Sequence, residues 1–165
     1  MEGHSAGNED STEDCSRCVD EAWSACYSDV AARCATVIAE GADLIPLVWR
    51  LRVVALVMDG RLTEASDAAD EYVTVVSAGF SGNWMRVADP ALTADALVLQ
   101  AETFVLVGKF DAAVKGITSA GDLDASIMSK STAVPLNGLS SHVPIAALLA
   151  LSTQLHELKT LGNQK

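Results

Sequence analysis

Aromatic and basic residues are scarce in this chain. Phe, Trp and Tyr make up 5% of its 165 residues, and 11 Lys and Arg stand against 22 Asp and Glu. The formal net charge of −11 at pH 7 argues against non-specific binding to nucleic acid or anionic lipid, because both attract clustered positive charge. Half of the residues are hydrophobic and 20% are charged, which is typical of a folded domain.

The chain also lacks a long hydrophobic run and a secretory signal. Its longest stretch without Asp, Glu, Lys or Arg is Ser131–His156. Pro135 and Pro144 interrupt this stretch, and its apolar part, Ile145–Leu151, is shorter than the roughly 20 residues that a bilayer requires. The first residues are polar and acidic, without an apolar signal region. We therefore expect no membrane span, a cytoplasmic location and reduced thiols.

Negative charge is concentrated at the N-terminus. Between Met1 and Asp29 there are eight acidic residues and one basic residue, Arg17. We expect residues 1–16 to form an acidic disordered tail ahead of a helical domain over residues 17–165. An acidic interaction tail is the alternative interpretation of the same residues.

Catalytic motifs are missing. The sequence contains no H-E-x-x-H, G-x-S-x-G, phosphate-binding loop or G-x-G-x-x-G pattern, and its histidines are scattered. Three acidic residues three and four positions apart can form a carboxylate pair on a helix, and a solvated face is the alternative. We expect no catalytic residue, no cofactor and no enzyme activity. The candidates considered are His4, His142, His156, Asp67, Asp70 and Glu71.

All four cysteines lie near the start of the chain. Cys15 and Cys18 have the spacing of half a zinc site, but no second C-x-x-C and no paired histidine follows. Cys18, Cys26 and Cys34 recur every eight residues, along one side of a helix, where they act as small hydrophobic residues. We therefore expect no metal site.

Apolar residues recur at intervals of three and four along nearly the whole chain, which predicts an all-α protein. For the segment Arg52–Met58, a buried strand is the alternative interpretation. Asp89-Pro90 predicts a helix N-terminus, and Ser141 is the expected cap of the last helix. The helices are expected at about 17–40, 43–58, from Leu62, 90–107, 110–119 and after Ser141, with loops at 77–83 and 121–142 and a short helical turn near 124–130.

An internal repeat is visible. Leu56–Ala65 and Phe104–Ala113 share the order large apolar, three residues, Gly, basic, large apolar, two residues, Ala, and they lie 48 residues apart (108 − 60). Leu158–Gly162 begins a third copy. Glycine permits a sharp bend after a helix, and the alanine lets two helices approach closely. Each copy is therefore expected to be an antiparallel helix hairpin that must stack on another hairpin.

These positions resemble the tetratricopeptide repeat (TPR) family. That family repeats every 34 residues, so the 48-residue offset implies an insertion of about 14 residues between about Tyr72 and Ala88. Val53 stands where the family has a small residue. The resemblance implies an all-α, TPR-like stack of antiparallel helix hairpins, a right-handed α-solenoid fragment of about six helices. The matching positions are Trp49, Leu56, Gly60, Leu62 and Ala65 in the first copy, and Leu97, Ala101, Phe104, Gly108, Phe110, Ala113 and Ile117 in the second.

A narrower resemblance concerns Trp49–Leu62 and Leu99–Gly108. Their order and spacing are similar to the helical repeat region of the subunit 12 family of the trafficking protein particle (TRAPP) complex. The resemblance implies a non-catalytic subunit in vesicle tethering between endoplasmic reticulum and Golgi, peripheral at those membranes, with other protein subunits as partners. That family continues with further repeats, so we expect either a fragment of a longer array or a last helix that packs on something else.

In the resembled fold the first helices of successive hairpins line a concave groove. The residues expected there are mostly valine, which suits a partner helix or another subunit and disfavours a clamp for a terminal carboxylate. The alternative is that these valines belong to the core. The alternative functions are a TPR adaptor of another cytosolic assembly and, third, a small metal-binding protein or enzyme. The expected groove residues are Arg50, Val54, Val57, Val98, Glu102 and Val105.

Overall fold

A computed structural model describes residues 10–41, 46–79, 89–136 and 142–164, with side chains from residue 25 onward. The regular elements of these ranges are helical, so the all-α prediction is confirmed there, and the alternative strand over Arg52–Met58 is wrong because that segment is helical. The elements are α1 (Asp10–Ala39), α2 (Pro46–Met58), α3 (Leu62–Ala78), α4 (Pro90–Leu106), α5 (Phe110–Leu123), a 3₁₀ helix η1 (Ala125–Ser129) and α6 (Ile145–Gly162).

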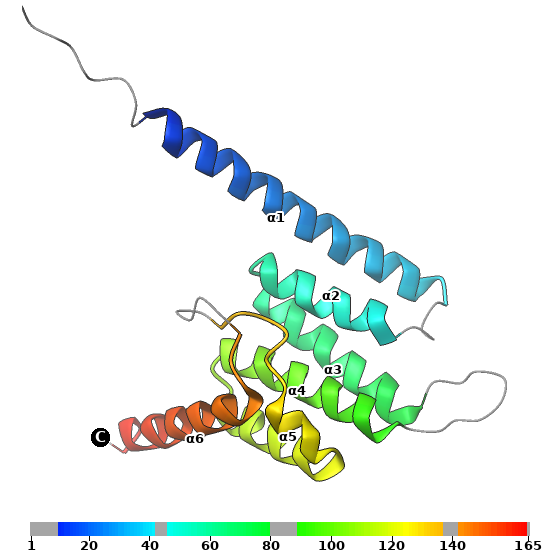
Figure 1. Ribbon diagram of the computed structural model, residues 1–165, viewed down its shortest axis with the longest axis vertical. Helices are drawn as coiled ribbons and strands as arrows, with labels where there is room; N and C mark the ends of the chain where they lie inside the picture. The colour runs from blue at the N-terminus through cyan, green and yellow to red at the C-terminus, as the bar shows by residue number, and fades with distance from the viewer. Residues whose placement is uncertain (1–9, 42–45, 80–88, 137–141, 165) are drawn as a thin grey trace, which may run out of the picture.

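Consecutive α-helices pack against one another from α1 to α6, and they alternate in direction through the stack (Figure 1). Two contacts skip a helix, between α2 and α4 and between α4 and α6. The helices α2, α4 and α6 therefore form one row. The helices that precede and follow each of them pack beside that row.

The bends after α2 and α4 are nearly identical. Gly60 and Gly108 both have a φ of +78°, a left-handed conformation that strongly favours glycine. In each bend the amide that follows the glycine donates back to the helix, from Arg61 to the Leu56 carbonyl at 2.9 Å and from Lys109 to the Phe104 carbonyl at 2.8 Å. This is the hydrogen bond of a Schellman-type helix end. Both predicted bends are confirmed.

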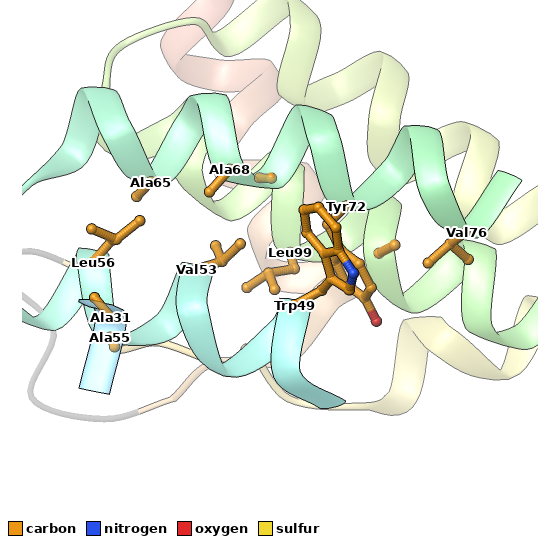
Figure 2. Close-up of a cluster of buried hydrophobic side chains, with 12 residues drawn as sticks. Ala31, Trp49, Val53, Ala55, Leu56, Ala65, Ala68, Tyr72, Val76 and Leu99 are labelled. Carbon is orange, nitrogen blue, oxygen red and sulfur yellow. The ribbon is translucent and has the colours of Figure 1, made fainter. Parts of the chain in front are cut away.

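The core consists of two clusters. The first joins α1, α2, α3 and α4, and in it Leu56 points toward Ala65 while Trp49 and Tyr72 both enter from their helices (Figure 2). The second joins α4, α5, η1 and α6 around Ala113. Ala65 and Ala113 are fully buried, as expected of small residues at close helix contacts.

Several predicted boundaries need correction. Helix α1 begins at Asp10 rather than near Arg17, so it overlaps the predicted tail over residues 10–16; acidic residues suit the first turn of a helix. Helix α3 continues to Ala78, into the loop predicted at 77–83, and α5 continues to Leu123 rather than ending near residue 119, where a loop was predicted over 121–142. Helix α6 is preceded by Pro144, without a side-chain cap, so the predicted cap Ser141, which lies outside the described residues, does not adjoin the helix.

Candidate protein-binding surface

The predicted groove residues lie on α2 and α4, which touch each other. Arg50 of α2 and Asp95 of α4 form the polar link between these helices, with Nε and Oδ2 3.1 Å apart. Of the predicted residues, Arg50, Val54 and Val57 are half-buried on α2, and Val105 is half-buried on α4. These four retain some surface for a partner.

One face of α2 carries exposed large apolar side chains. Leu47, Leu51, Val54 and Met58 follow one another at spacings of four, three and four, so they lie along one stripe of the helix. Leu47 is 68% exposed and Leu51 46% exposed. Sequence reasoning named Val54 but missed its three neighbours, although their spacing from Val54 marks them. We call these four residues the α2 stripe.

The corresponding face of α4 is covered by the chain itself. The segment Thr132–Leu136, which we call the strap, leads away from η1 and passes across the stack toward α2 and α3 (Figure 1). Val98 and Glu102 are buried, and the strap residue Leu136 shares a core cluster with Val98. Val98 and Glu102 were predicted to line an open groove, but they have no free surface in this arrangement. The strap, a segment of low periodicity, folds back onto them.

Glu102 fastens the strap to α4. Its side chain is 1% exposed, and its two carboxylate oxygens accept from the Ala133 amide at 2.9 and 3.0 Å. Oε2 also accepts from the Val134 amide at 3.1 Å. Burial raises the pKa of Glu102 to about 7; the two amides and Arg50 lower it, and Asp95 raises it further.

Further bonds hold the start of the strap against the residues before α6. The Thr132 amide donates to the Val143 carbonyl at 2.8 Å, and the Ile145 amide donates to the Lys130 carbonyl at 2.9 Å. The His142 ring nitrogen Nδ1 lies 2.7 Å from the Thr132 carbonyl oxygen. The first residue of the strap is therefore fixed beside the start of α6.

Two buried polar groups, on Trp49 and Tyr72, lie on α2 and α3. Burial raises the pKa of Tyr72 to about 12, with a further contribution from Asp95 and an opposing one from Arg50, so its hydroxyl remains protonated. Trp49 Nε1 and Tyr72 Oη are both buried without a hydrogen-bond partner. A protonated phenol and an indole N–H are poor proton acceptors, so neither of these two groups is suited to act as a general base.

The acidic cluster on α3 forms ties to neighbouring helices. Asp67 is exposed, Asp70 accepts from Gln100 Nε2 at 2.6 Å, and Glu71 pairs with Arg52 at 3.0 Å. These three residues therefore lie on a solvated face of α3, as the alternative interpretation predicted.

The histidine and cysteine side chains that the structure describes are dispersed. His156 is exposed on α6, and His4 lies outside the described residues. Cys26 is exposed and Cys34 buried, and burial raises the pKa of the Cys34 thiol against an opposing effect of Arg52. Within the ranges that the structure describes, no group of three or more His, Cys, Asp or Glu side chains could hold a metal ion.

Helix α6 packs on α5 and touches α4, just as α4 packs on α3 and touches α2. Two of its leucines, Leu158 and Leu161, are more than 60% exposed. No helix in the described part of the chain is long and apolar enough to cross a membrane. Comparisons of the sequence and structure with known protein families, with curated proteins and with solved structures find no significant match.

Proposed function

We propose that this protein is a non-catalytic, TPR-like helical scaffold that binds another protein through the α2 stripe. The observation that carries the proposal is the exposure of Leu47, Leu51 and Met58 on a helix whose opposite side belongs to the core. Large apolar side chains aligned on one helix face are stabilised when a partner covers them. An amphipathic partner helix fits such a face, with its own apolar residues at spacings of three and four.

The repeated packing supports a hairpin stack. In the first two copies, Leu56 and Phe104 precede a glycine bend and the following helix packs back on the same helix. Leu158 occupies the matching position before Gly162 and is exposed. Helix α6 packs on α5 as α4 packs on α3, but Gly162 ends it without the left-handed φ of Gly60 and Gly108, so the bend expected of a third copy is not formed.

The resemblance to the TRAPP subunit 12 family makes the proposal specific. On this proposal the protein is a subunit of a vesicle-tethering complex that acts between endoplasmic reticulum and Golgi, on the cytoplasmic side. The partners are then other protein subunits, and neither a cofactor nor nucleic acid is required.

Affinity purification followed by mass spectrometry tests both levels of the proposal. Tagged wild-type chain is compared with the double variant Leu47→Glu/Leu51→Glu and with Ser119→Glu, which adds a charge at an exposed position of α5. We expect TRAPP subunits with the wild type and with Ser119→Glu, and their loss from the double variant.

Two results would change this conclusion. A reproducible set of other proteins, lost only from the double variant, would place the scaffold in a different cytosolic assembly. Partners that remain bound to the double variant would show that the α2 stripe is not the binding face.

A further inference from the structure

The strap lies on α4 and bends at Ala133 and Val134, which turns both of their amides toward the same side. Thr132, Val134 and Leu136 are buried, whereas Ala133 and Pro135 between them are half-buried. The strap carries no charged side chain, and its link to the carboxyl group of Glu102 is the one that its amides make.

The polar contact at the centre of the strap is Glu102. Both carboxylate oxygens face the consecutive amides of Ala133 and Val134. The nearest basic side chain, Arg50 of α2, is bonded to Asp95 instead, which lies on α4 with Glu102. His142, which precedes α6, faces the Thr132 carbonyl rather than Glu102. Burying a carboxylate with two amide partners and no ion pair leaves a large part of its lost hydration uncompensated.

We propose that the strap is a cover over Val98 and Glu102 whose opening is coupled to the loss of a proton from Glu102. With the cover closed, the neutral acid suits the buried site. With the cover open, water solvates the ionised carboxylate. Rising pH therefore favours the open cover, and falling pH favours the closed one.

The energetics of burial support this direction. The pKa of Glu102 under the closed strap is about 7 against an ordinary value of 4.5, and burial is the largest cause. Glu102 therefore binds its proton more strongly in the closed state than in the open state. Between pH 4.5 and pH 7 this difference in proton binding stabilises the closed state. Between pH 6 and pH 8 the equilibrium constant for opening is expected to rise roughly tenfold.

An open cover would extend the apolar face of α2 onto α4. Val98 would become available, and Glu102 would offer its oxygens to the backbone amides of a partner segment in place of those of Ala133 and Val134. This consequence for partner binding rests on the proposed function, whereas the cover itself can be tested on the isolated protein.

Amide hydrogen exchange at pH 6 and pH 8, corrected for intrinsic rates, tests the proposal. The amides of Ala133 and Val134 are expected to be less protected than the core amide of Val53 at both pH values, and to lose roughly tenfold in protection at pH 8. Glu102→Gln, which cannot ionise, is expected to abolish the difference. His142→Asn is the matched control and should retain it, because histidine is the other side chain that commonly titrates in this range.

Several outcomes would overturn the cover. The protection of Ala133 and Val134 could be the same at the two pH values. The pH dependence of this protection could persist in Glu102→Gln, or it could disappear in His142→Asn. Exchange of the strap only together with Val53 would show that the cover does not open by itself. If Glu102→Gln fails to fold, the Glu102 carboxyl resonance of the wild type decides the matter, since a midpoint near 4.5 contradicts the coupling. None of these readouts depends on a partner, so they can fail while the scaffold function stands.

Discussion

The hairpin α2–α3 and the hairpin α4–α5 share one bend geometry but present different faces. Gly60 and Gly108 have the same φ and the same backward hydrogen bond. Position by position, 48 residues apart, Leu51 corresponds to Leu99 and Val54 to Glu102. Leu51 is 46% exposed and Leu99 1% exposed. A bend follows from a few adjacent residues, whereas the burial of a helix face depends on which distant segment reaches it.

The difference has two sources. Leu99 lies in the cluster that Tyr72 and Val76 of α3 help to form, while Leu51 is left outside it. On the side of the predicted groove, the strap covers Glu102 but leaves Val54 half-buried. The repeat thus produces two similar hairpins whose first helices differ in burial, because α3 and the strap together cover α4.

The largest contrast is expected between Leu99→Ala and Leu51→Ala. Leu99→Ala removes a fully buried side chain and is expected to lower the free energy of unfolding by about 2–5 kcal/mol. Leu51→Ala removes an exposed one and should stay within about 0.5 kcal/mol of wild type. Urea denaturation measures both. Equal losses would mean that the two helices have the same environment after all.

The next contrast concerns pH. The pKa of Glu102 in the folded chain is about 7, above its ordinary 4.5, so its contribution to stability is complete below about pH 4.5 and is lost as pH rises through 7. Relative to Glu102→Gln, the wild type is expected to lose roughly 3 kcal/mol over this range. Denaturation at several pH values measures it. The variant Val54→Glu, at the uncovered position, should add no such dependence.

A smaller effect is expected when a larger side chain is placed at the close helix contact inside each hairpin. Ala65→Phe and Ala113→Phe replace fully buried alanines and are each expected to cost roughly 1–3 kcal/mol. Ala147→Phe, at an exposed site of α6, is the control. If the midpoint of thermal unfolding falls in only one of the two buried variants, the two hairpins are packed differently.

The smallest effect is expected at the bends, where the two hairpins should agree. Gly60→Ala and Gly108→Ala place a side chain in open space, so the cost is that of the left-handed backbone, about 1–2 kcal/mol in each case. Gly116→Ala is the control: its Cβ would lie 3.5 Å from Ala101 Cβ and from the Leu97 carbonyl oxygen, an ordinary contact, and it gains helix propensity. A large difference between the two bends would contradict their equivalence.

The local features of this fold could be predicted from the sequence. The bends at Gly60 and Gly108 and the N-terminus at Asp89-Pro90 each depend on a few adjacent residues. Asp89 indeed accepts from the Ala91 amide at 2.9 Å. The short helical turn before Lys130 was also expected, and Asp124 caps it through the Ser126 amide at 3.0 Å.

The surface features could not be predicted in the same way. Glu102 and Ala133 are 31 residues apart, and Ala133 lies in the stretch of low periodicity that follows α5, so nothing local marks the carboxylate as buried. The leucines of the α2 stripe fit a core pattern equally well, and their exposure depends on how the neighbouring helices pack.

The strap also bears on the order in which the chain folds. Contacts between consecutive helices join residues close in sequence and form quickly, whereas the bond from Glu102 to Ala133 must close a longer loop. We expect the strap to dock after the rate-limiting step of folding. Strengthening it would then lengthen the lifetime of the native state while leaving the refolding rate unchanged.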